Sequence, residues 1–148
     1  MKIEIDQSGK IENTNHLTVI AFSNKINKSI LITAKDKKSL QSVFRRINQP
    51  RIFISKVFAA AIFLLLKNDF KNLDIVIIDT EYPGHENTIR KYLNDFFNQG
   101  NYRFEKLDIH FKNIGKRSKA HDIAWKSYRR KRADFKASAQ DLLQVLFK

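Results

Sequence analysis

The stretch LDIVIIDTEYPG, residues 73–84, decides the fold class of this 148-residue chain. Its continuous run of β-branched residues predicts a central strand over residues 72–79 that is covered on both faces. Asp79 ends this run, and a partly buried carboxylate is costly without a metal ion or a hydrogen-bond donor. Asp79 is therefore a candidate functional residue.

The segments around this strand predict the rest of a mixed sheet. Upstream, apolar segments separated by polar turns indicate an antiparallel meander of three strands, and an alternating segment downstream indicates a fifth strand. Apolar residues at helical spacing predict helices between and after the strands. The expected strands are residues 2–6, 17–22, 29–33, 72–79 and 102–111, and the expected helices are residues 37–48, 52–67, 89–97, 119–132 and 137–147.

This order of elements predicts a single α/β domain over residues 1–148. A meander followed by crossover connections gives a five-stranded mixed sheet with helices on both faces. Strands four and five should be parallel, with strand four beside strand one. Reactive groups of such sheets gather beyond the carboxyl ends of the parallel strands.

Composition points to a polyanionic partner and to a soluble protein. The chain has 28 Lys and Arg against 15 Asp and Glu, a formal charge of +13, which favours nucleic acid as the partner. The longest apolar run, residues 57–66, is about half a membrane span, and the N-terminal segment lacks the apolar core of a signal peptide. We therefore expect no membrane association and a cytoplasmic location.

Three aspartates are the candidate active-site residues. Asp6 ends the first strand, so it should lie beside Asp79 where these parallel strands end. Asp122 begins a basic helix, whose dipole favours an ionised carboxylate. Each has a plainer interpretation, because Asp6 could open a turn and Asp122 could be an ordinary first-turn acid. With no cysteine and no zinc-type His spacing, any metal should be bound mainly by oxygen.

The order of elements, with the motifs IDQSG, IVIID and AHDIAWKSYR, resembles the ribonuclease H-like superfamily. That superfamily includes ribonucleases H, Holliday-junction resolvases, transposases and proofreading exonucleases. The resemblance implies a nuclease that hydrolyses phosphodiester bonds in DNA or RNA with two Mg²⁺ or Mn²⁺ ions. Asp6 would bridge the ions, with Asp79 and Asp122 as further catalytic ligands.

The first helix departs from the ribonuclease H pattern. No acid lies between Asp36 and Asp69, so the glutamate of true ribonucleases H is missing. Glu81 is the closest candidate for the fourth catalytic and metal-binding group, and Glu86 is the next. This placement looks more like the resolvase branch, whose paired incisions would require a homodimer.

The late basic segment is the predicted nucleic-acid surface. Residues 112–136 hold ten Lys or Arg and two acids, and they would contact phosphates without reading base sequence. Trp125 is expected to pack on the core beside Tyr128. His121 and His85 fit either proton shuttles or solvated surface residues. The predicted phosphate contacts are Lys116, Arg117, Lys119, Lys126, Arg129 and Arg130.

Two other function classes remain open from the sequence. A nucleic-acid-binding module without catalysis would explain the charge and the missing helical glutamate. A structural or assembly subunit would use residues 57–66 as an oligomer interface.

Overall fold

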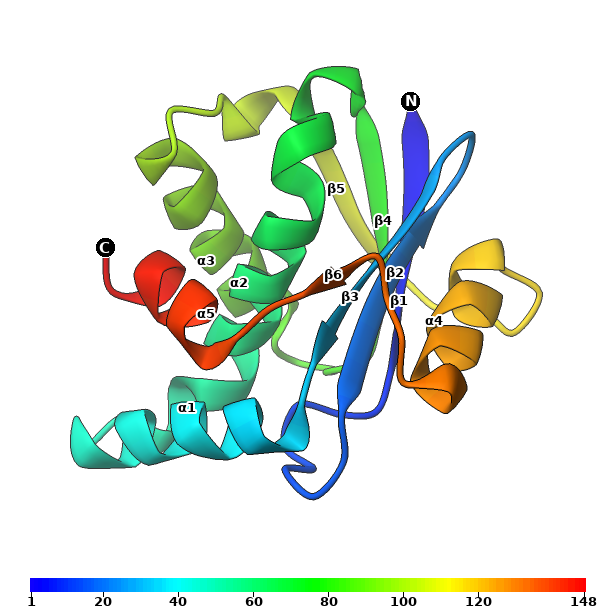
Figure 1. The fold of residues 1–148 in the computed structure, drawn as a ribbon. Helices are drawn as coiled ribbons and strands as arrows, with labels where there is room; N and C mark the ends of the chain where they lie inside the picture. The colour runs from blue at the N-terminus through cyan, green and yellow to red at the C-terminus, as the bar shows by residue number, and fades with distance from the viewer.

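A six-stranded mixed sheet organises the protein in a computed structural model that describes residues 1–148 (Figure 1). The strand order is β5-β4-β1-β2-β3-β6, with β1–β3 antiparallel and β4 and β5 parallel to β1. The predicted α/β class, the meander and the parallel β1–β4 pair are confirmed. The strands are β1 (Lys2–Ser8), β2 (Thr18–Ser23), β3 (Asn27–Ile32), β4 (Ile75–Asp79), β5 (Asp108–Lys112) and β6 (Phe135–Lys136).

The predicted number of five strands is wrong, because β6 adds a two-residue strand parallel to β3. Asp134 precedes β6 and accepts a hydrogen bond from the backbone N–H of Ser29 at 2.9 Å. On the other side of β6, the N–H of Ala137 donates to the carbonyl of Leu31 at 2.9 Å. These long-range bonds, rather than any alternating pattern, place this segment on the edge of the sheet.

The helices lie close to their predicted positions. They are α1 (Ala34–Arg46), α2 (Phe53–Leu66), α3 (Glu86–Gln99), α4 (Lys119–Arg130) and α5 (Ala139–Leu146), with three 3-10 helices η1 (Pro50–Ile52), η2 (Lys67–Asn72) and η3 (Phe104–Lys106). The start predicted for the fifth strand is wrong, because η3 occupies that segment. Phe104 of η3 and Leu107, which directly follows it, are both buried and three residues apart, as one face of a tight helical turn requires.

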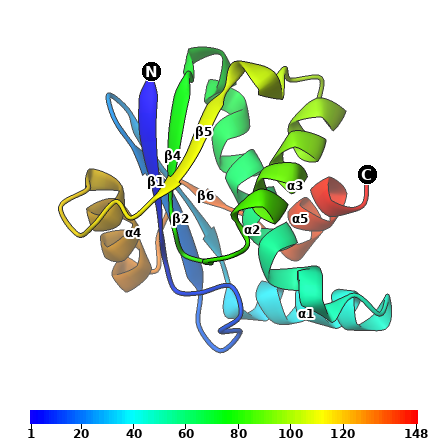
Figure 2. The same ribbon diagram turned by 180° about the vertical axis from the view of Figure 1, so that it is seen from behind.

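The two faces of the sheet are covered unequally. Helices α2, α3 and α5 lie on one face, and α4 lies alone on the other, as the two opposite views show (Figures 1 and 2). The first face holds a core of 34 buried residues, whereas a cluster of four lies between the sheet and α4 and consists of Val19, Ala21 and Leu31 with Ala124 of α4. Strand alternation explains the division, because Ile3 and Ile5 point to the large core while Glu4 and Asp6 point to α4.

Helix α2 is the centre of the large core. Eleven of its residues are buried, including nearly all of residues 57–66. The suggestion that this segment forms an exposed oligomer interface is therefore wrong. None of the helices combines the length and the apolar character needed to cross a membrane.

A buried lysine fixes the loop between β1 and β2. Lys37 of α1 is fully buried, and its Nζ donates to the carbonyls of Lys10 and Asn13 and to Thr18 Oγ1 at 2.7–3.0 Å. Burial lowers the pKa of Lys37 to about 8, against the opposing charge of Glu12. Lys37 thus anchors the loop that follows β1 to α1, beside the carboxyl end of β1.

Candidate metal centre

Strand register places Asp6 and Asp79 side by side. In the parallel β1–β4 pair Ile5 faces Ile78, so the next residues along the two strands are Asp6 and Asp79. Both follow residues of the large core, and strand alternation turns both aspartates to the α4 face. The predicted proximity of these two residues is confirmed.

Glu81 joins the two aspartates through the turn after β4. One carboxylate oxygen from each of Asp6, Asp79 and Glu81 lies within 4.8 Å of the others. The N–H of Glu81 donates to the carbonyl of Asp79 at 2.8 Å, which closes the turn. The next residue, Tyr82, is buried, and its hydroxyl accepts hydrogen bonds from Gln7 Nε2 at 2.9 Å and from the Ile11 N–H at 3.0 Å. Tyr82 therefore ties the turn to β1.

The three carboxyl groups repel one another electrostatically. Burial, together with the charges of Asp79 and Asp6, raises the pKa of Glu81 to about 8, against the attraction of Lys10. Asp6 is 5% exposed, and burial raises its pKa too. Hydrogen bonds from the Gln7 N–H and from His121 oppose that rise. The group is short of positive charge although the whole protein is strongly cationic.

His121, and not its neighbour Asp122, faces the cluster. Nδ1 of His121 lies 2.8 Å from Oδ2 of Asp6. The carboxylate of Asp122 is 54% exposed and pairs with Lys126 at 3.0 Å, outside the carboxylate group. The rotation of α4 explains this, because the Ser118 hydroxyl at its N-terminus donates to Glu4 of β1 at 2.9 Å.

The other groups considered from the sequence also lie outside the cluster. Glu86 accepts a hydrogen bond from the Gly84 N–H at 2.9 Å at the start of α3. His85 Nδ1 lies 3.5 Å from the hydroxyl of Ser55. The sequence offers Glu81 and Glu86 as the fourth acid, and only the carboxylate of Glu81 lies close to those of Asp6 and Asp79.

The donor set of the cluster fits a hard divalent cation. Three carboxylates that converge from two strands and one turn can hold a metal ion. Mg²⁺ and Mn²⁺ prefer such oxygen ligands, and their charge would relieve the repulsion that raises the pKa of Glu81. Ile114 supports this geometry, because its N–H donates to Oδ1 of Asp79 at 3.0 Å and fixes that carboxylate.

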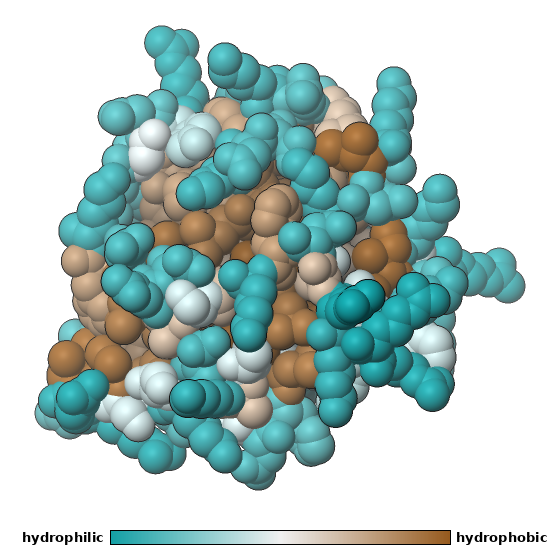
Figure 3. Space-filling view, viewed as in Figure 1, coloured by the Kyte–Doolittle hydropathy of each residue, from teal (hydrophilic) through white to brown (hydrophobic).

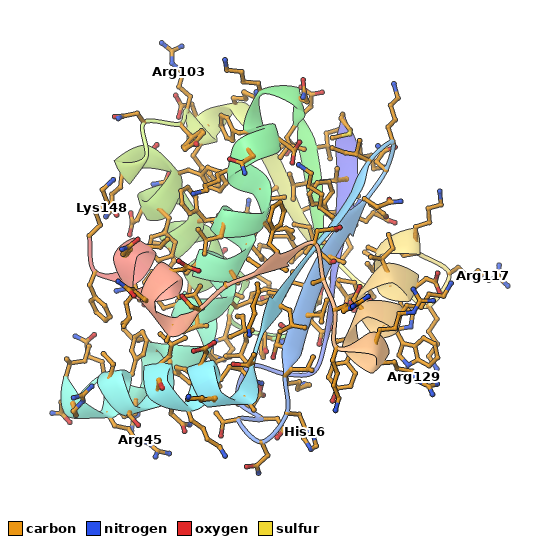
Figure 4. The ribbon with its side chains drawn as sticks, viewed as in Figure 1. His16, Arg45, Arg103, Arg117, Arg129 and Lys148 are labelled. Carbon is orange, nitrogen blue, oxygen red and sulfur yellow. The ribbon has the colours of Figure 1, made fainter.

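A basic surface flanks the cluster on α4 and on the loop before it. All six side chains predicted to contact phosphates are exposed, and only Lys126 is paired with an acid. Arg117 and Arg129 project away from the sheet on the same side of the molecule (Figure 4). Hydrophilic side chains also project from the right-hand edge of the surface, where α4 lies (Figure 3).

Trp125 belongs to this basic surface, so its predicted packing on the core is wrong. Its side chain is 46% exposed, and the guanidinium of Arg129 lies over its ring at 5.0 Å. Ala120 and Ala124 supply the buried face of α4 instead.

No family model, curated protein or solved structure matches this chain. The resemblance to the ribonuclease H-like superfamily therefore stays a prediction.

Proposed function

We propose that this protein is a divalent-metal-dependent nuclease that hydrolyses phosphodiester bonds in DNA or RNA. The observation that supports the proposal best is the convergence of Asp6, Asp79 and Glu81 within 4.8 Å at the carboxyl ends of two adjacent parallel strands. We also propose that the fold is ribonuclease H-like. That resemblance predicts a meander whose first strand lies beside a parallel fourth strand, with an acid on each strand, and this is the arrangement of Asp6 on β1 and Asp79 on β4.

The proposed chemistry needs a cation at the carboxylates. When bound, two Mg²⁺ or Mn²⁺ ions would activate a water molecule and stabilise the leaving oxygen. Asp6, Asp79 and Glu81 would hold these ions through their carboxylate oxygens. His121 fixes the orientation of Asp6 through its 2.8 Å contact.

The basic side chains of α4 would hold the substrate backbone. Lys119, Lys126 and Arg129 are exposed on the helix whose first turn carries His121, so a phosphate chain bound there passes close to the carboxylates. These contacts neutralise phosphates and release counterions, which makes affinity fall steeply with salt.

A non-catalytic nucleic-acid-binding module is the second candidate. The Asp6–His121 contact and the raised pKa of Glu81 favour it, because together they let the cluster reduce its own charge without a metal. Activity measurements separate the two candidates.

The test is cleavage of labelled single-stranded, double-stranded, hybrid and branched substrates in Mg²⁺, Mn²⁺ or EDTA. We expect metal-dependent cleavage that falls at least about 100-fold in Asp6→Asn and in Asp79→Asn, because ligands of catalytic ions are worth several kcal/mol. Asp122→Asn is the matched control, since it makes the same change on an exposed side chain outside the cluster, and it should retain activity. Cleavage that survives both cluster variants would overturn the assignment, and salt-sensitive binding without any cleavage would establish the binding module.

A further inference from the structure

We propose that Trp125 is a stacking platform for an unpaired base, so that the preferred ligand is single-stranded nucleic acid lying along α4. The inference rests on the proposed function and specifies its substrate. Trp125 is the only tryptophan of the chain, and it is 46% exposed on a helix whose other exposed residues are all charged. The fold does not use this indole for packing, because Ala120 and Ala124 fill that role.

The surroundings of the indole suit a base and its phosphate. The guanidinium of Arg129 lies over the ring at 5.0 Å, which restricts the orientation of the indole and places a cation beside it. Aromatic rings interleaved with cations bind single strands, because the ring stacks on a base while the charges follow the backbone. In a duplex the base faces are already stacked on neighbouring pairs, so the indole favours an unpaired segment.

Helix geometry places Trp125 next to the carboxylate cluster. It follows His121 by four residues, so the two share one side of α4 and are separated by about 6 Å along its axis. His121 contacts Asp6, so the indole lies about one helical turn along α4 from the residue that reaches the carboxylate cluster. A base stacked there would fix which phosphate reaches the carboxylates.

A cavity lies at the far end of α4. It has a volume of about 530 Å³, and its lining includes Tyr128, Lys131, Arg132 and His16. Tyr128 is partly buried and packs against the small core cluster beneath this end of α4. Lys131 and Arg132 at this end of α4 would contact the phosphates of a strand that extends beyond Trp125.

The single tryptophan makes its own fluorescence the direct test. The full-length protein is titrated in EDTA with an oligothymidylate, with a duplex of equal length, and with an oligomer of abasic sites that keeps the phosphates and lacks bases. Binding is followed in parallel by the anisotropy of a labelled strand. We expect the oligothymidylate to quench Trp125 fluorescence at saturation, whereas the abasic oligomer binds without comparable quenching. A saturated single-strand complex with unchanged fluorescence would overturn the proposal.

Variants give an independent measurement. Trp125→Ala should weaken single-strand binding by about 5- to 150-fold, and Trp125→Phe should weaken it less, because a smaller ring still stacks. Phe147→Ala is the matched control, since Phe147 is equally exposed at 46% but follows α5, on the other face of the sheet, and it should leave binding unchanged. Lys126→Ala should weaken single-strand and duplex binding alike.

The outcomes separate stacking from catalysis, because binding in EDTA needs no cleavage. Equal single-strand affinity of Trp125→Ala and wild type would refute stacking, while cleavage that depends on Asp79 would leave the nuclease proposal intact. Quenching by single strands without any metal-dependent cleavage would support stacking and favour the binding module.

Discussion

Replacing Asp79 by Asn should raise the free energy of unfolding of the metal-free protein. The same replacement should reduce the additional stability that a bound metal ion gives. The substitution deletes one of three crowded negative charges and keeps the size of the side chain. The amide oxygen of Asn can still accept the 3.0 Å hydrogen bond that Asp79 Oδ1 accepts from the Ile114 N–H. The change therefore isolates the electrostatic role of this carboxylate.

The magnitude follows from the spacing of the carboxylates. Two unit charges 4.8 Å apart repel by about 3.5 kcal/mol at an effective dielectric constant of about 20. Asp79 and Glu81 are only partly buried, so solvent and salt screen this value, and we expect a gain of about 1–2 kcal/mol in the free energy of unfolding. For a chain of this length that gain corresponds to a rise of about 2–8 °C in Tm.

The pH dependence has a definite sign. The pKa of Glu81 is raised from 4.5 to about 8, so the folded state without metal holds this proton more tightly than the unfolded chain. The resulting stability is present below pH 4.5 and is lost as pH rises through about 8. The advantage of Asp79→Asn over wild type should therefore be small near pH 5 and largest near pH 9.

Thermal unfolding followed by circular dichroism at pH 5 and pH 9, in EDTA and in excess Mg²⁺, measures these effects. Mg²⁺ should raise the Tm of wild type, because a ligand that binds only the folded state adds about 2.7 kcal/mol to the free energy of unfolding at a concentration about 100 times its Kd. Mg²⁺ should raise the Tm of Asp79→Asn far less. Asp122→Asn, whose exposed carboxylate pairs with Lys126, is the control and should change little in either condition. A lower Tm of Asp79→Asn in EDTA at pH 9, with no response of wild type to metal, would refute the reasoning and make Asp79 a structural residue.

Three further outcomes are expected. His121→Ala should weaken Mn²⁺ binding, measured by calorimetry, by about 10- to 100-fold with the fold intact, because it removes the group that orients Asp6; unchanged affinity would exclude that role. Lys37→Met should lower the free energy of unfolding in urea by about 1–3 kcal/mol, because buried acceptors in the loop after β1 lose their donor; a value near zero would show that water replaces it. Arg130→Ala should reduce the slope of log affinity against log salt by about 0.7–0.9, and an unchanged slope would place Arg130 outside the phosphate path.

The sheet and the Asp6–Asp79 pair could be predicted because local patterns encode them. The β-branched run before Asp79 indicates a central strand, and the alternation of Ile3 and Ile5 with Glu4 and Asp6 determines which face each side chain takes. Once β1 and β4 are neighbours in parallel register, the two aspartates have to lie close together. No long-range information beyond the order of elements is needed for this part of the site.

The rotation of α4 could not be predicted, and it decides which of its residues reach the site. Consecutive helical residues differ by about 100° in direction, so a small rotation exchanges His121 for Asp122. A hydrogen bond between Ser118 and Glu4, 114 residues apart in sequence, fixes that rotation. The same rotation leaves Trp125 in solvent. Helical periodicity identified the helix, but it could not choose between two polar faces.

The carboxylate cluster lies beside the basic side chains of α4, and this position affects how the protein would bind phosphates. Phosphates attracted by the basic side chains of α4 would meet three crowded acids beside that helix, which would repel them. The positive charges that oppose the raised pKa values of Glu81 and Asp6 are those of Lys10 and His121, although the chain carries 28 Lys and Arg. A divalent cation at Asp6, Asp79 and Glu81 would turn this repulsion into attraction. Occupancy of the metal centre should therefore strengthen nucleic-acid binding as well as permit cleavage, which is a coupling that a purely structural acidic cluster would not produce.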